Sequence, residues 1–248
     1  MTPRGSALAL ASINIERSKH LGRVAAFLRA QSPDVVCLQE LVPDDISVFR
    51  DELGYRHHVS IPMARFPEHG QLRLTGVGIF SRHAFEFTED IPYAGGGSGS
   101  DVVDRTSEES RFQTARYTLA VVGIRLGGDA YTIATTHFPW TDNARTSDFQ
   151  RTACDALLRS LTGRPLLLCG DFNAPRGGEI WAKLATRYQD NIPKEYHSSL
   201  DPHLHRLLDS KKLVVDGLWS TPAYRVSGVR LVEGVSDHKA VVGFIERV

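Results

Sequence analysis

The chain has 248 residues, of which 42% are hydrophobic, enough to bury the core of a single large domain. Its 29 basic residues (Lys and Arg) balance its 29 acidic residues (Asp and Glu), which excludes a generally basic nucleic-acid coat, an acidic tail and an extensively disordered chain. A nucleic-acid substrate would therefore need a local basic patch. We expect one domain over residues 1–248, acting as a monomer.

The cysteines and the apolar runs indicate the cellular setting. Cys37, Cys154 and Cys169 are odd in number and lack CxxC spacing, so we expect neither a disulfide framework nor a thiolate zinc site, and a reducing, cytoplasmic location fits. The first apolar run is interrupted by Ser12 and Asn14, which favours a first strand over a signal peptide. No later run approaches the roughly eighteen apolar residues of a membrane span.

Short segments rich in β-branched residues and separated by Gly, Pro or Asp predict strands along the chain. In chain order they are 8–15, 35–39, 77–80, 114–124, 131–136, 166–169, 213–219, 226–232 and 240–245. Apolar residues at helical spacing predict helices over 21–28 and 153–161. The segments 114–136 and 213–245 read as hairpins or meanders, and the pattern as a whole predicts an α/β protein with mixed sheets covered by helices.

Three further segments, 61–75, 93–109 and 189–210, are predicted to be long loops, either functional or disordered. The second begins with the glycine-rich run AGGGSGS. We expect no helix after these glycines, and no Lys-Ser or Lys-Thr pair follows them. They are therefore expected to form a hinge or a lid rather than a phosphate-binding loop.

Polar residues recur at or near the ends of the predicted strands. A single one would be an ordinary cap or turn, but the repetition indicates a functional edge. Carboxylate and amide oxygens suit Mg²⁺ or Mn²⁺ better than zinc, and histidine supplies a group for proton transfer near neutral pH. The residues are Asn14, Glu16, Glu40, His137, Asp171, Asn173, Asp216, Asp237 and His238.

The motifs SINIE, VVCLQE, GVGIFSR, TTHF, CGDFN, VVDGLW and VSDH resemble, in order and spacing, those of the endonuclease/exonuclease/phosphatase superfamily. The resemblance runs from about Ala9 to Phe244. It implies a deoxyribonuclease I-like α/β/β/α sandwich of four layers, in which helices flank two packed mixed sheets. It also implies a phosphoesterase that uses Mg²⁺ or Mn²⁺.

The resemblance implies a metal site. Glu40, the Glu of LQE, is the first expected ligand, and Asn14 supports it. Glu16 stands where the family usually has Asp or another oxygen donor, and Asp237 is a further possible ligand. Glu16 is one methylene longer than Asp, and Gly217 replaces an aromatic or polar residue. The resemblance therefore does not fix the arrangement of ligands around the metal.

The resemblance also implies catalytic roles. Asp171 positions or deprotonates the attacking water, and Asn173 contacts the phosphate. His238 is the general base or the phosphate-stabilising group, and Asp216 orients it. His137 matches the second histidine of the deoxyribonuclease, sphingomyelinase and tyrosyl-phosphodiesterase branches, which disfavours cleavage at abasic sites.

Four residues are candidates for substrate contact. Arg111 and Tyr93 correspond to family positions near the substrate, although Arg111 can equally be a surface residue. Trp140 and Arg145 follow His137 and can stack a base or bind a phosphate, or Trp140 can belong to the core.

The predicted function is hydrolysis of a phosphate ester, slightly favouring a nucleic-acid phosphodiester such as a nuclease or tyrosyl-DNA phosphodiesterase substrate. A phosphatase acting on a small metabolite or phospholipid is the alternative, and a binding module without catalysis is another. A zinc cluster of a different hydrolase is the remaining alternative, formed by His197, Asp201, His203, His205 and Asp209.

Overall fold

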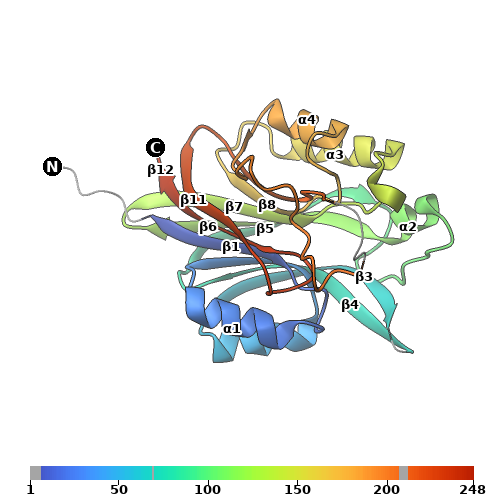
Figure 1. The fold of residues 1–248 in the computed structure, drawn as a ribbon, viewed down its shortest axis with the longest axis horizontal. Helices are drawn as coiled ribbons and strands as arrows, with labels where there is room; N and C mark the ends of the chain where they lie inside the picture. Colours follow the sequence, from blue (N-terminus) through green and yellow to red (C-terminus); the bar gives the residue numbers. More distant parts are fainter. Residues whose placement is uncertain (1–6, 69, 207–211) are drawn as a thin grey trace.

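Two six-stranded sheets form the centre of the protein, in a computed structural model that describes residues 7–68, 70–206 and 212–248 (Figure 1). The first sheet has the order β11-β12-β1-β2-β4-β3. Its strands are β1 (Leu8–Asn14), β2 (Val35–Leu41), β3 (His57–Glu68), β4 (Gln71–Ser81), β11 (Tyr224–Val232) and β12 (Ala240–Arg247). The second sheet has the order β5-β6-β7-β8-β10-β9. Its strands are β5 (Phe85–Gly95), β6 (Arg116–Leu126), β7 (Asp129–His137), β8 (Leu167–Asp171), β9 (Gln189–Asp190) and β10 (Asp216–Ser220).

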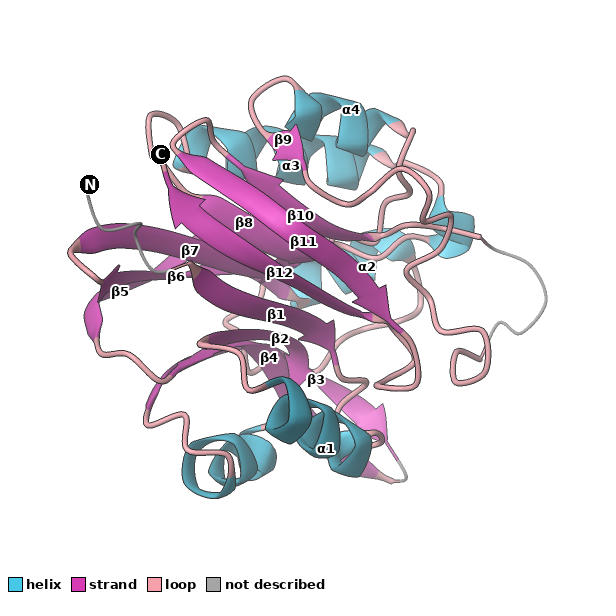
Figure 2. Ribbon diagram, turned by 60° about the vertical axis from the view of Figure 1, so that its left-hand side comes forward, coloured by secondary structure: helices cyan, strands magenta, loops and turns pink. Residues whose placement is uncertain are grey.

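Helices cover the two outer faces. Helix α1 (Leu21–Gln31) lies on the side of the first sheet, and α3 (Asp148–Ser160) and α4 (Glu179–Ala185) lie on the side of the second, as Figures 1 and 2 show. Shorter helical segments are α2 (Glu108–Thr114), η1 (Pro43–Asp45), η2 (Val48–Glu52) and η3 (Asp142–Ala144). The predicted four-layer sandwich is confirmed. Among the described residues, no helix is both long and apolar enough to cross a membrane.

Central strands bury both of their faces because successive side chains point to opposite sides of a sheet. In β1 and β2, Leu10 and Cys37 belong to the core between the two sheets. Their neighbours Ala11 and Val36 belong to the smaller core beneath α1. This double burial explains why both strands are mostly apolar on both faces.

Strand direction determines where the polar ends of the strands meet. Strands β1 and β2 are parallel, and so are β7 and β8, so the carboxyl ends of each pair lie at one edge of their sheet. Strand β12 is antiparallel to β1, and β10 is antiparallel to β8, so both begin at that edge. The motifs of the sequence therefore converge at one end of the sandwich.

Two predictions about connections are wrong. Residues 61–68 and 71–75, expected to belong to a loop, form part of the long hairpin of β3 and β4. Residues 213–245 do not form one meander, since β10 belongs to the second sheet and β11 to the first. Local periodicity indicates a strand but does not identify its partner.

The glycine-rich run packs closely against the backbone before β6. A Cβ atom at Gly95 would collide with the carbonyl oxygen of Ala115, and one at Gly97 with that of Thr114. The Gly97 amide donates to the same Ala115 oxygen at 3.1 Å, and α2 follows the run. These glycines allow close backbone packing.

Candidate active site

Sheet register aligns three of the predicted residues. Asp171, the last residue of β8, pairs with His137 of β7 on one side and with Asp216 of β10 on the other. Asn14 ends β1 in the facing sheet, and its Nδ2 donates to Asp171 Oδ2 at 3.1 Å. This bond joins the two sheets at the site, and Asp171 lies at its centre, 1% exposed.

His238 lies between two carboxylates. Its Nδ1 is 2.8 Å from Asp216 Oδ2, and its Nε2 is 3.8 Å from Asp171 Oδ2. Burial alone would lower the pKa of His238, but the charges of Asp216 and Asp171 raise that pKa well above its ordinary value. Burial would raise the pKa of Asp171, but His238 and His137 bring it below the ordinary value. The site thus favours an imidazolium beside an ionised Asp171.

The GDFN turn orients Asp171. The Asn173 amide donates to Asp171 Oδ1 at 2.8 Å, and Asn173 has a φ of 48°, a left-handed conformation that asparagine tolerates. Asn173 Nδ2 donates to the Phe138 carbonyl at 2.9 Å. His137 Nε2 is 3.5 Å from Asp171 Oδ2, and Asp171 and Glu40 together outweigh burial and raise the pKa of His137. Asp171 is therefore oriented from both sides.

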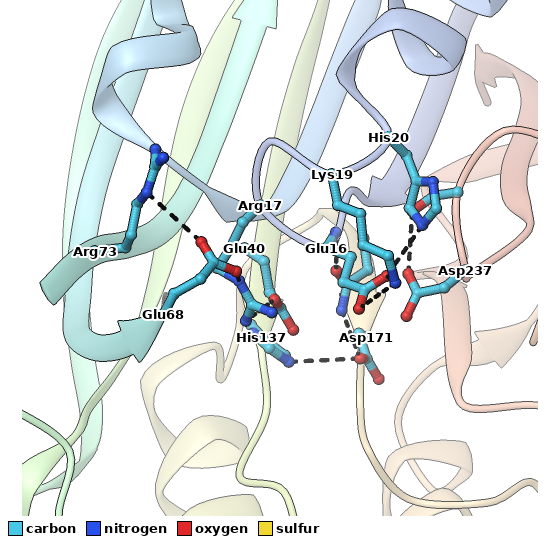
Figure 3. A network of polar contacts seen from close by, with 12 residues as sticks. Glu16, Arg17, Lys19, His20, Glu40, Glu68, Arg73, His137, Asp171 and Asp237 are labelled. Atoms are coloured by element: carbon cyan, nitrogen blue, oxygen red, sulfur yellow. Dashed lines mark hydrogen bonds and ion pairs between the residues drawn. The ribbon is translucent and has the colours of Figure 1, made fainter. Parts of the chain in front are cut away.

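Glu40 is part of a chain of charges that reaches the β3–β4 hairpin (Figure 3). Arg17 Nη1 is 3.0 Å from Glu40 Oε2, and Arg17 Nε is 2.7 Å from Glu68 Oε1. Arg73 Nε lies 3.6 Å from Glu68 Oε2. Arg17 therefore offsets the negative charge of Glu40 in this structure, and the Glu40 carboxylate still lies next to His137.

Glu16 lies on the other side of the centre and contacts three basic side chains. Lys19 Nζ is 2.8 Å from its Oε2, His20 Nε2 is 3.0 Å from the same atom, and Arg206 Nη2 is 3.1 Å from its Oε1. These contacts outweigh burial and lower the pKa of Glu16. Asp237 faces this group, with potential ligand atoms of Glu16, His20 and Asp237 within 4.8 Å of one another.

The donor set fits a hard divalent cation. Figure 3 shows Glu40, Asp171 and Asp237 along the site, and carboxylate oxygens suit Mg²⁺ or Mn²⁺. Among the described residues, the groups of three whose potential ligand atoms lie within 4.8 Å of one another include Asp171 and Asp237 but not Glu40. The zinc alternative gains no support, because the metal-capable groups among the described residues include only His205 from the proposed loop cluster. Asp209 of that cluster lies outside the described residues.

The candidate substrate residues fall into different settings. The Arg111 guanidinium carbon lies 4.4 Å from the Trp140 ring centroid, and Trp140 is 45% exposed. Arg145 is exposed at the end of η3. Tyr93 instead lies in the core, with its hydroxyl 2.8 Å from Thr136 Oγ1, so it does not offer that hydroxyl to a substrate in this structure.

Sequence reasoning missed the basic residues that surround the two glutamates. Arg17, Lys19 and His20 follow Glu16 directly in the sequence ERSKH, and that local charge density was an available signal. Glu68 and Arg206 come from distant segments. Their participation depends on the β3–β4 hairpin and on the loop before residue 207, whose positions local sequence does not reveal.

Residues 11–238 match the model of the Endonuclease/Exonuclease/phosphatase family, and the chain belongs to this family. Its members are generally phosphoesterase hydrolases. No curated protein matches the chain significantly.

Several solved structures share the fold. An endonuclease/exonuclease/phosphatase from Beutenbergia cavernae DSM 12333 has a TM-score of 0.75 and 18% identity, covering 97% of this chain and 72% of that chain. The human Nocturnin catalytic domain with bound sulfate has a TM-score of 0.72 and 18% identity, covering 100% and 96%. D. rerio TDP2 complexed with a single strand DNA product has a TM-score of 0.66 and 16% identity, covering 97% and 99%. These identities establish a common fold alone.

Proposed function

We propose that this protein is a divalent-metal-dependent phosphodiesterase that hydrolyses its substrate by in-line attack of water. The observation that supports it best is the arrangement of His238, Asp216 and Asp171, with His238 bonded to Asp216 at 2.8 Å and 3.8 Å from Asp171. An ionised carboxylate beside a buried imidazolium supplies an acceptor for water and a donor for phosphate.

Each residue then has a role set by its contacts. Asp171, fixed by Asn14 and by the Asn173 amide, accepts a hydrogen bond from the attacking water. His238 donates from Nε2 to a phosphate oxygen, because Asp216 occupies its Nδ1. His137 lies on the opposite side of Asp171 and donates to the phosphate or to the leaving oxygen.

We propose that Glu40, Asn14 and Asp237 hold Mg²⁺ or Mn²⁺. The bound cation would supply positive charge for a non-bridging phosphate oxygen and for the leaving oxygen. Glu16 is omitted from this ligand set because three basic side chains already contact its carboxylate. Arg17 must leave Glu40 Oε2 if the cation is to use that atom.

A nucleic-acid strand is the substrate that the surroundings favour. The exposed ring of Trp140 offers a stacking surface, and the Arg111 guanidinium lies over that ring, with Nη2 3.8 Å from Asp142 Oδ1. Aromatic stacking next to a guanidinium is a common platform for single-stranded nucleic acid. We propose that Arg145, which is exposed on the same loop, contacts the sugar-phosphate backbone of that strand. We also expect the enzyme to be monomeric and cytoplasmic.

A substrate panel tests the proposal. Single-stranded DNA, RNA, a tyrosyl-nucleotide ester, a sugar phosphate and sphingomyelin are offered with Mn²⁺ to the wild type and to Trp140→Ala. We expect hydrolysis of a nucleic-acid ester, with KM raised about tenfold or more by Trp140→Ala. Preferential turnover of the sugar phosphate or lipid would favour the alternative phosphatase, and no turnover of any substrate would favour a binding module.

A further inference from the structure

The proposal concerns Lys19, Arg206 and the carboxylate between them. Glu16 is buried, with a side chain 7% exposed, whereas the side chains of Lys19 and Arg206 are 44% and 72% exposed. A buried carboxylate thus gathers two basic groups at the protein surface (Figure 3 shows Glu16 with Lys19). The arrangement brings the two basic groups to one point, where either alone would be an ordinary solvated side chain.

Both basic groups retain hydrogen-bond donors after binding Glu16. The Lys19 ammonium has three N–H groups and donates to both Glu16 oxygens, at 3.0 and 2.8 Å. The Arg206 guanidinium has five N–H groups, and its Nη2 contacts Glu16 Oε1 at 3.1 Å. The remaining donors of two exposed cations provide the chemistry that binds a phosphate.

The loop that carries Arg206 is fixed to the catalytic segment. The Asp201 amide donates to the Asp237 carbonyl at 2.8 Å, and Leu200 forms a β-bridge with His238. Asp201, 2% exposed, accepts from the Leu204 amide at 3.0 Å and from the Gly234 amide at 2.6 Å. The segment from Leu200 to Leu204 is therefore fixed beside His238, and Arg206 follows it by two residues and contacts Glu16.

The basic pair lies close to the reacting centre but is distinct from it. Potential ligand atoms of Glu16 and Asp237 lie within 4.8 Å, and those of Asp237 and His238 lie within the same limit. Asp237 thus lies near both the Glu16 carboxylate and the catalytic imidazole. A phosphate bound by Lys19 and Arg206 would be a neighbour of the scissile phosphate.

We propose that Lys19 and Arg206, organised by Glu16, form a subsite for a second phosphate of the substrate, one nucleotide unit from the scissile bond. The inference rests on the proposed function and narrows it to substrates with at least two phosphates. It assigns Glu16 a positioning role for the two cations. A nucleic-acid strand supplies such a phosphate, and so does a small sugar bisphosphate.

Paired chromogenic esters test the subsite. The first is the 5′-(p-nitrophenyl phosphate) of thymidine, and the second carries an added 3′-phosphate. In the wild type we expect the added phosphate to raise kcat/KM about tenfold or more. In Lys19→Met/Arg206→Gln the ratio of the two kcat/KM values should fall to about one. The control Arg225→Gln should retain the ratio, because Arg225 on β11 is 69% exposed and pairs with Glu246 on β12.

A binding measurement separates failure of the subsite from failure of the proposed function. Calorimetry compares thymidine 5′-monophosphate with thymidine 3′,5′-bisphosphate, and glucose 1-phosphate with glucose 1,6-bisphosphate, without requiring turnover. If neither ester is hydrolysed, the proposed function fails and the ratio of dissociation constants decides the subsite. Tighter binding of the nucleoside bisphosphate alone, lost in the double variant, supports a nucleic-acid strand. The same gain for the sugar bisphosphate indicates a small substrate.

Two results would overturn the subsite. One is a wild type that gains nothing from the second phosphate in either measurement, and the other is a gain that persists in the double variant. If the double variant does not fold, Arg206→Gln alone replaces it, because that side chain is 72% exposed and its loss leaves Lys19 on Glu16.

Discussion

The bond between Asp216 and His238 makes the sharpest quantitative prediction. Asp216 is 3% exposed and its Oδ2 lies 2.8 Å from His238 Nδ1. Asp216→Asn keeps the shape but removes the charge that stabilises the imidazolium. A hydrogen bond to a charged group contributes about 1.5 to 3 kcal/mol, and about 1.4 kcal/mol is a factor of ten. We therefore expect kcat/KM to fall by about 10- to 100-fold or more.

The assay is Mn²⁺-dependent hydrolysis of the thymidine p-nitrophenyl ester, with circular dichroism to establish folding. Asp190→Asn is the matched control. Asp190, on the neighbouring strand β9, accepts a hydrogen bond from Trp181 at 3.0 Å and pairs with Arg176 at 3.3 Å, away from the site. The control should keep kcat/KM within about twofold. A folded Asp216→Asn enzyme with kcat/KM as high as that of the control would refute the assigned role.

Three further results are expected. Glu40→Gln should weaken Mn²⁺ binding about tenfold or more by calorimetry, and unchanged affinity would remove Glu40 from the ligand set. Gly170→Ala should lower the free energy of unfolding in urea by more than about 1 kcal/mol, because Gly170 has a φ of 140° and a Cβ there would collide with the Thr136 carbonyl. Gly22→Ala, in α1 with nothing within 4 Å, should raise it by up to about 1 kcal/mol, and a reversed sign at either position would contradict this packing. In EDTA, His238 has a higher pKa in the folded protein than in the unfolded chain. The protonated side chain therefore stabilises the fold fully below the unfolded pKa of about 6.5, and this stabilisation is lost as the pH rises through the folded pKa. The unfolding free-energy difference between wild type and His238→Gln should therefore shrink at alkaline pH, and a difference that grows would contradict the stated direction.

The layers of the fold followed from sequence because strand and helix periodicity are local properties. The double burial of β1 and β2 produced apolar runs that predicted strands, and the α1 pattern gave a helix. The hairpin of β3 and β4 was missed because its outer residues, 65–68 and 71–74, are all exposed or half-buried, so they lack the buried apolar face that marks a strand. The separation of β10 from β11 was missed because sheet membership depends on long-range pairing.

The residues expected at the site were found from the family motifs, and the structure brings Asn14, His137, Asp171, Asp216 and His238 together. Their convergence follows from two parallel strand pairs, which a strand pattern alone does not specify. The motif around Glu16 did not predict all of its ion pairs, because Arg206 contacts it from a loop that is distant in the sequence. Tyr93 lies in the core, where its ring stacks on that of Phe138 with centroids 6.1 Å apart, a long-range contact that the sequence does not reveal.

Metal-dependent turnover by the wild type, compared with Asp171→Asn and His238→Ala, tests the central claim most directly. With Mg²⁺ or Mn²⁺ we expect hydrolysis of a phosphodiester, and we expect EDTA to abolish it. Each substitution should lower the rate by orders of magnitude. The double variant should be little slower than either single variant, because the residues act as a unit. Hydrolysis that survives EDTA or either substitution would contradict the proposed chemistry, as would a wild type that neither cleaves a phosphate ester nor binds Mn²⁺.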